Sequence, residues 1–169
     1  MRQTILTITL LMASASLAQG QAVLQKTGHG INLATHRCMG WQLSAKHESE
    51  DAGAGQRDVT YSFTNQGPAP CTLRGFPKFT LLNRWGHPMS GQSITHMSES
   101  VTTVTLAPSG KAFFNIHYSA CSTVGTPPCR FSSRVRIKAP RTSHYFRIRD
   151  RLDPFQLSVQ VSPVKSNAP

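Results

Sequence analysis

The sequence predicts an all-β domain, namely an immunoglobulin-like antiparallel β-sandwich of about eight strands stapled by disulfides. Apolar and polar residues alternate with a period of two along several segments, most clearly at Phe155, Leu157, Val159 and Val161. Gly- and Pro-rich turns separate these segments, and no window sustains the 3.6-residue period of a helix. Many short, closely spaced strands are typical of a sandwich, with a barrel as the alternative.

Eight segments carry the strand pattern along the chain. They are residues 41–48, 59–64, 79–82, 101–106, 112–118, 134–138, 146–149 and 155–162. Turn residues stand between them at 66–68, 85–86, 108–110 and 126–128. The run DAGAG at residues 51–55 has no apolar side chain larger than alanine, and we expect it to form a flexible loop.

The N-terminal residues have the order of a secretory signal peptide. A cationic start at Met1 and Arg2 precedes an apolar stretch and a tail of small residues. We expect a signal peptide at 1–18, with a cut after residue 22 as the alternative, then a lead-in at 19–37. One β-sandwich domain at 38–164 and a tail at 165–169 complete the chain. The apolar stretch is shorter than the ~20 residues of a membrane-spanning helix, so we expect a secreted, periplasmic or extracellular protein without a membrane span.

The chain is strongly basic. It holds 18 Lys and Arg against 7 Asp and Glu, which gives a formal net charge of +11 and a pI near 10.3. Such an excess favours anionic partners, which for an exported protein would be an envelope component or an acidic protein rather than nucleic acid. The alternative is that the charge only maintains solubility.

The four cysteines, Cys38, Cys71, Cys121 and Cys129, form an even set, which in an exported chain indicates two disulfides with three possible connectivities. Cys121 and Cys129 bracket a short turn-rich segment that can bring their α-carbons within the ~4.4 to 6.8 Å of a disulfide. Cys38 would then pair with Cys71. A catalytic cysteine motif and the close cysteine pairs of a zinc site are both missing from the sequence.

Several segments resemble the bacterial domain-of-unknown-function 4232 family. They are residues 64–67 (TNQG), 71–77 (CTLRGFP), 81–86 (LLNRWG), 104–110 (VTLAPSG) and 161–163 (VSP). The resemblance spans residues 38–164 and implies a secreted or periplasmic β-sandwich. It assigns no catalytic residue to the chain.

A cationic run lies near the C-terminus, at residues 133–152. One strand of it would carry Arg134, Arg136 and Lys138 on one face, and a second would carry Arg147, Arg149 and Arg151. With residues 139–145 as the loop, the two predict a hairpin with six cations on one side, while Asp150 points to the other face.

Two interpretations of this hairpin are open. Like charges facing each other across strands cost roughly 0.2 to 1 kcal/mol per pair, which an anionic partner would relieve, so the hairpin is our candidate anion-binding site. The alternative is a solvated outer face that discourages aggregation between sheet edges.

A second candidate site is the set His87, Met89, His96 and Met97. Imidazole and thioether ligands together suit copper, so a periplasmic copper-binding module is the alternative function, and no other cofactor is expected. The competing interpretation is surface histidines with methionines packed on the sandwich.

We expect no enzyme activity. The seven carboxylates are scattered, and the chain has no G-x-S-x-G, H-E-x-x-H or phosphate-binding glycine motif. The sequence therefore predicts an exported, non-catalytic binding or structural module.

Overall fold

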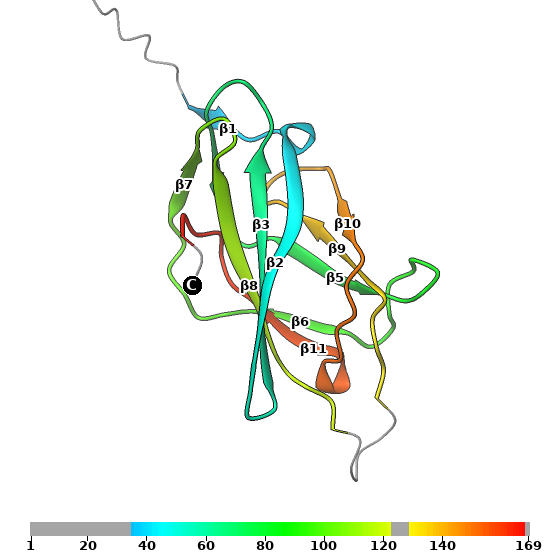
Figure 1. The fold of residues 1–169 in the computed structure, drawn as a ribbon. Helices are drawn as coiled ribbons and strands as arrows, with labels where there is room; N and C mark the ends of the chain where they lie inside the picture. Colours follow the sequence, from blue (N-terminus) through cyan, green and yellow to red (C-terminus); the bar gives the residue numbers. More distant parts are fainter. Residues whose placement is uncertain (1–34, 123–128, 168–169) are drawn as a thin grey trace, which may run out of the picture. The chain divides into compact units, whose positions relative to one another are not determined.

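The computed structural model describes residues 35–122 and 129–167 (Figure 1). The expected signal peptide, most of the lead-in and the turn at 126–128 lie outside these residues. The strands are β1 (His36–Arg37), β2 (Leu43–Gly53), β3 (Gln56–Asn65), β4 (Cys71–Arg74), β5 (Lys78–Leu82), β6 (Ser93–His96), β7 (Thr103–Leu106), β8 (Lys111–Ser119), β9 (Arg134–Lys138), β10 (Phe146–Ile148) and β11 (Ser158–Val161). Short 3-10 turns occur at Gly40–Gln42 and Phe155–Leu157, and the described ranges contain no α-helix.

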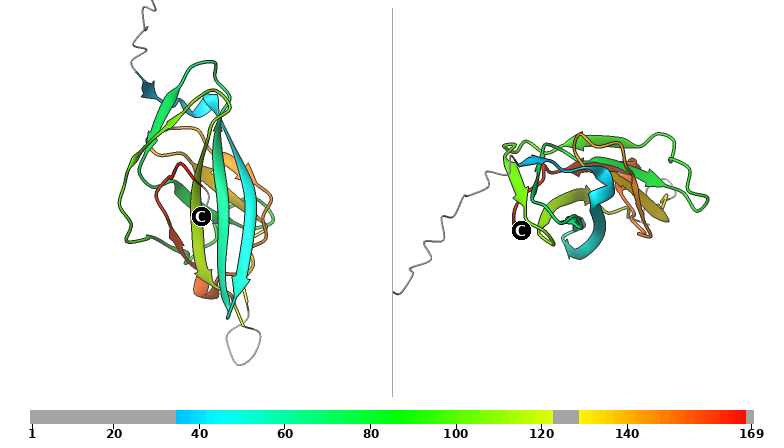
Figure 2. Two further views of the ribbon diagram at one scale, coloured as in Figure 1. Left: turned by 60° about the vertical axis from the view of Figure 1, so that its left-hand side comes forward. Right: turned by 90° about the horizontal axis from the view of Figure 1, so that it is seen from above.

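The strands form three sheets. A five-stranded sheet has the order β2-β3-β8-β11-β6, and two three-stranded sheets have the orders β10-β9-β5 and β1-β4-β7. Figure 2 shows β2, β3 and β8 as one layer, with β9 and β10 in a layer behind it. Neighbouring strands run antiparallel except for β1 with β4 and β6 with β11, which run parallel. The predicted all-β sandwich with two disulfides is confirmed, and its arrangement is consistent with an immunoglobulin-like type.

Aromatic side chains join the two layers. Within the large sheet, the rings of Tyr61 and Phe63 on β3 stack on Phe114 of β8, with centroids 5.5 and 5.2 Å apart. Across the sandwich, Tyr61 lies 6.0 Å from Phe79 of β5, and Phe63 lies 5.9 Å from Phe146 of β10. Such pairs contribute about 0.5 to 1.5 kcal/mol each beyond their burial. This core fixes the sheet that carries β9 and β10 against the large sheet.

Each of the eight predicted strands has a counterpart, but the sequence pattern missed β1, β4 and β6. These strands have two, four and four residues, and β6 (SITH) has no alternation of buried and exposed positions. The prediction was also wrong at residues 41–42 and 155–157, which belong to 3-10 turns. The Trp41 side chain is 74% exposed instead of facing the core.

The prediction of a flexible loop at residues 51–55 is wrong. Strand β2 continues through Gly53, and β3 begins at Gln56. Ala54 and Gly55 form the turn between them with φ values of 46° and 77°. Positive φ at both central residues is the conformation of a two-residue hairpin turn, whose twist matches that of the flanking strands.

The end of the chain is attached to the sandwich at least as far as Lys165. The buried Val164 donates its backbone N–H to the Gly75 carbonyl at 3.0 Å. Lys165 exchanges two backbone hydrogen bonds with Phe113, both 2.8 Å long, and its Nζ lies 2.8 Å from Glu99. These contacts extend the pairing beside β8 beyond the end of β11.

Asn65 explains part of the sequence signature at residues 64–110. The side chain is fully buried, and its Nδ2 donates to the carbonyls of Ala69, Leu106 and Ala107 at 2.9 to 3.3 Å. Its Oδ1 accepts a 2.9 Å hydrogen bond from the Gly67 N–H. One amide therefore holds together the two turns that follow β3 and β7.

Candidate anion-binding face

The predicted cationic hairpin is formed by β9 and β10. Arg136 lies directly opposite Arg147, and Val135 lies opposite Ile148. Val135 is completely buried, so the alternating residues of β9, including Arg136, face outward. On its other side β9 pairs with β5, where Lys138 lies opposite Lys78, a cation that the sequence reasoning missed.

We call this surface the cationic face. It consists of Lys78, Arg134, Arg136, Lys138 and Arg147, which the strand registers place on the outer side of the β10-β9-β5 sheet. Strand β10 ends at Ile148, so Arg149 and Arg151 lie in the exposed segment that follows it. The ladder itself therefore holds four of the six predicted cations.

An aromatic ring lies among these cations. The Tyr145 side chain is 43% exposed, and its ring centroid lies 5.0 Å from the Arg136 guanidinium carbon and 5.2 Å from Lys138 Nζ. A cation over an aromatic ring is stabilised by about 0.5 to 1 kcal/mol at exposed sites. Tyr145 precedes β10 and shares the parity of Arg147, which is the sequence signal that could have identified it.

Two further exposed aromatic rings are covered by arginines nearby. The Arg84 guanidinium lies 4.1 Å from the Trp85 ring centroid, and the Arg84 carbonyl accepts a 3.0 Å hydrogen bond from Arg134 Nη1. The Arg151 guanidinium lies 4.4 Å from the ring of Phe131. Three exposed aromatic rings, Trp85, Phe131 and Tyr145, thus each have a cation over the ring.

The nearest carboxylate in sequence is turned away from the cationic face. The Asp150 side chain is 9% exposed, and its Oδ2 lies 3.0 Å from His47 Nδ1. The same oxygen accepts a 2.5 Å hydrogen bond from the Tyr61 hydroxyl. Burial and the Asp150 carboxylate together raise the pKa of Tyr61 well above its ordinary value. The inward direction predicted for Asp150 is confirmed.

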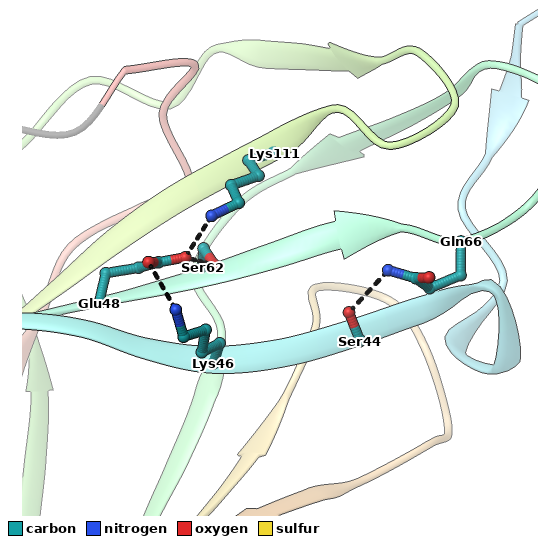
Figure 3. A network of polar contacts seen from close by, with 6 residues as sticks. All are labelled: Ser44, Lys46, Glu48, Ser62, Gln66 and Lys111. Atoms are coloured by element: carbon teal, nitrogen blue, oxygen red, sulfur yellow. Dashed lines mark hydrogen bonds and ion pairs between the residues drawn. The ribbon is translucent and has the colours of Figure 1, made fainter.

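Another carboxylate, Glu48, lies on the large sheet, where two lysines balance its negative charge (Figure 3). Glu48 Oε1 accepts hydrogen bonds of 2.7 Å from both Ser62 Oγ and Lys111 Nζ, and Oε2 lies 3.5 Å from Lys46 Nζ. The hydrogen bonds from Lys111 and Ser62 lower the pKa of Glu48 to about 2, although partial burial opposes them. Glu48 is the extra residue of a β-bulge between His47 and Ser49, which explains how it reaches this position.

The ion pairs of the described residues lie away from the cationic face. Ion pairs join Lys46 and Lys111 to Glu48, Arg57 to Glu50, and Lys165 to Glu99, while the imidazoles of His47 and His117 contact Asp150 and Asp58 at 3.0 and 2.9 Å. Among residues 35–122 and 129–167, no ion pair involves the cationic face. The cations of β5, β9 and β10 have no carboxylate partner in this part of the chain.

The four residues considered for copper have separate structural contacts. Met89 belongs to the buried core, and the His96 ring stacks on Phe76 with centroids 4.0 Å apart. His87 is exposed in the turn after β5, and Met97 donates its backbone N–H to Val161. The described part of the chain has no group of three or more His, Cys, Asp or Glu side chains that could hold a metal ion.

Both expected disulfides are formed. Cys38 pairs with Cys71 and Cys121 with Cys129, with α-carbons 4.8 and 5.8 Å apart. Two disulfides are typical of a protein of an oxidising, extracytoplasmic compartment. Within the two described ranges, no helix has the length and apolar character needed to cross a membrane.

Comparison with known proteins identifies the family. No curated protein matches the chain. The family model described as "Domain of unknown function (DUF4232)" matches residues 38–165, which covers the two disulfides, the Asn65 turns and the whole cationic hairpin. This match confirms the resemblance seen in the sequence, and the chain belongs to the DUF4232 family.

Proposed function

We propose that this chain is an exported, non-catalytic binding module that docks through the cationic face onto an anionic polymer of the cell envelope. The observation that carries the proposal is the ladder of cations across three strands, Lys78 to Lys138 and Arg136 to Arg147, without an ion pair among the described residues.

The spacing of these cations suits a polymer better than a single ion. Neighbouring strands lie about 4.8 Å apart, and alternate residues on one strand lie about 6.6 Å apart. The backbone positions that carry these cations therefore lie a few ångströms apart, so an extended anionic polymer can meet several of them at once. At physiological salt the Debye length is about 8 Å, so these cations act mainly on groups in contact with them.

Repulsion between the cations of the face favours the binding of an anionic partner. Arg136 opposite Arg147 and Lys78 opposite Lys138 each cost roughly 0.2 to 1 kcal/mol in the free protein. An anionic partner removes this cost and adds charge-assisted hydrogen bonds to the guanidinium groups. The exposed ring of Tyr145 adds a flat apolar surface between the charges.

The test compares two variants that lose the same number of cations. In the first, Arg134, Arg136, Arg147 and Arg149 are changed to Ser. In the control, Lys46, Arg57, Lys111 and Lys165, which are all ion-paired, are changed to Ser. Binding to immobilised lipopolysaccharide and to a soluble acidic polysaccharide is measured by surface plasmon resonance at low and physiological salt.

The first variant is expected to bind at least tenfold more weakly and with a smaller salt dependence, while the control keeps most of the affinity. Equal losses in both variants would show that net charge, not the cationic face, governs binding. Binding of an acidic protein with no binding of either polysaccharide would replace the polymer by a protein partner.

A further inference from the structure

A second cationic surface lies on the β1-β4-β7 sheet, apart from the cationic face. Arg37 lies opposite Thr72, and Arg74 lies opposite Thr103. Their strand neighbours Cys71, Leu73, Val104 and Leu106 are buried in the core. The two arginines and two threonines therefore share the outer side of this sheet.

These four side chains line a small cavity of about 160 Å³, which Arg141 and Pro140 complete from the β9–β10 loop. None of the lining residues is acidic. The ion pairs recorded in the described ranges include none of the three arginines. The three arginines and the Thr103 hydroxyl are donors of the kind that bind phosphate or sulfate oxygens, whereas the Thr72 hydroxyl donates to the His36 carbonyl at 3.4 Å.

A wider cavity of about 370 Å³ adjoins the first through Arg141, which lines both. Its wall includes the exposed side chains of Trp41 and Met39, together with His144. Gly40 makes this wall possible, because a Cβ at that position would lie 2.4 Å from the His144 Cβ. The Cys38–Cys71 disulfide anchors the same segment to β4, so the two cavities rest on a fixed framework.

We propose that the two cavities form one site for a sugar that carries a phosphate or sulfate group. The anionic group occupies the arginine cavity, and the sugar ring lies against the Trp41 indole in the wider one. An exposed indole suits this role because it offers a rigid apolar surface at low entropic cost, while the indole N–H is a polar donor. The site shares no residue with the cationic face and does not depend on the proposed polymer docking.

Trp41 provides the direct measurement. The chain has two tryptophans, so Trp85→Phe leaves Trp41 as the single tryptophan, whose emission can be excited selectively at about 295 nm or longer wavelengths, where tyrosine no longer absorbs. This protein is titrated with glucose 1-phosphate, glucose 6-phosphate and N-acetylglucosamine 6-sulfate, with glucose and inorganic phosphate as comparisons. We expect a saturable change in Trp41 emission with at least one anionic sugar, and an affinity at least tenfold weaker for glucose or phosphate alone.

Variants then locate the anionic group. Arg37→Ser and Arg74→Ser are each expected to weaken binding at least tenfold, as loss of a charged hydrogen-bond donor does. Arg141→Gly should do the same without backbone strain, because Arg141 has a φ of 59° that glycine adopts freely. Arg57→Ser is the matched control and should leave the affinity within twofold, because Arg57 pairs with Glu50 on the large sheet and lines neither cavity.

The proposal is overturned if none of the three sugars changes the Trp41 emission, or if Arg57→Ser weakens binding as much as Arg74→Ser. Equal affinity for inorganic phosphate and the anionic sugars would leave a bare anion site and remove the sugar. Polymer binding by the cationic face is measured separately, so either proposal can fail while the other stands.

Discussion

Arg136 and Arg147 lie directly opposite each other in the β9–β10 ladder, although both are cations. The Tyr145 ring lies 5.0 Å from the Arg136 guanidinium carbon and stabilises that cation by a cation–π contact. Arg136 Nε is moreover a buried donor without a hydrogen-bond partner among the described residues. Keeping these two arginines opposite each other therefore lowers the stability of the free protein, and an anionic partner that binds between them would restore it.

A charge reversal at Arg147 tests that cost. Arg147→Glu places a carboxylate opposite Arg136, so we expect the free energy of unfolding to rise by about 0.2 to 1 kcal/mol. Binding to acidic polysaccharide should fall at the same time. Urea unfolding followed by circular dichroism measures the first effect. Arg57→Glu is the control, because it breaks the pair with Glu50 and should lower stability. A loss of stability in Arg147→Glu would contradict the account.

The Glu48 network gives a pH-dependent prediction. Its pKa is about 2 in the folded protein against about 4.3 in an unfolded chain, so Glu48 stabilises the fold fully above pH 4.5 and loses this effect as the pH falls towards 2. Glu48→Gln should therefore lower the free energy of unfolding by about 1 kcal/mol at pH 7. At pH 2 the variant and the parent protein should differ much less.

The measurement is urea unfolding of both proteins at several pH values between 2 and 7. Ser44→Ala serves as the control, since Ser44 lies on the same strand and bonds only the exposed Gln66 side chain in Figure 3. Its effect should not vary with pH. A constant difference between Glu48→Gln and the parent across the whole range would rule out the lowered pKa.

The two disulfides should differ in their contribution to stability. Cys38 and Cys71 are 33 residues apart and buried, whereas Cys121 and Cys129 are 8 residues apart and partly exposed. In the chain-entropy account, replacing the first pair by Ala lowers the free energy of unfolding by about 3 to 4 kcal/mol, and replacing the second by about 2 to 3 kcal/mol. Equilibrium unfolding of the two double variants gives the order, and a larger loss for the Cys121–Cys129 pair would reverse it.

Much of the fold could be predicted because burial on one face imposes a period of two. Residues 134–138 were predicted with the right bounds, since Val135 and Ile137 alternate with three cations. Strand β6 was missed because its backbone pairs with β11 while its side chains stay largely exposed, which leaves no pattern in the sequence. The β2–β3 turn was misread because small residues suit both a loop and a turn with positive φ.

Only the part of the candidate site that lies on the β9–β10 hairpin was predicted from the sequence. The alternation of Arg134 to Lys138 and the position of Arg147 gave the cations of β9 and β10. Lys78 could not be included, because it joins the face through the pairing of β5 with β9, about 60 residues away in sequence. The cavity of Arg37, Arg74 and Arg141 was missed for the same reason, since three separate segments form it.

Asn65 provides a last prediction, on the family signature itself. The fully buried Asn65 amide bonds three carbonyls and the Gly67 N–H, so Asn65→Ala removes four hydrogen bonds, although the Ala107 carbonyl still accepts one from the Gly110 N–H at 2.8 Å. We expect a loss of about 2 to 4 kcal/mol in the free energy of unfolding, because each unsatisfied buried group costs about 1 to 3 kcal/mol. Gln66→Ala, at the exposed neighbour, should cost less than about 0.5 kcal/mol.

Asn65→Asp separates hydrogen bonding from packing, because the two side chains have nearly the same shape. An ionised carboxylate cannot donate to the Ala69 and Leu106 carbonyls, so burial will raise its pKa above the unfolded value. The folded variant then binds a proton more tightly than the unfolded chain, and its stability falls as the pH rises through the folded pKa. Urea unfolding between pH 4 and 8 should show the Asp variant closest to the parent protein at the acidic end. A variant that is equally stable at both ends would mean that the amide hydrogens of Asn65 do not hold the two turns together.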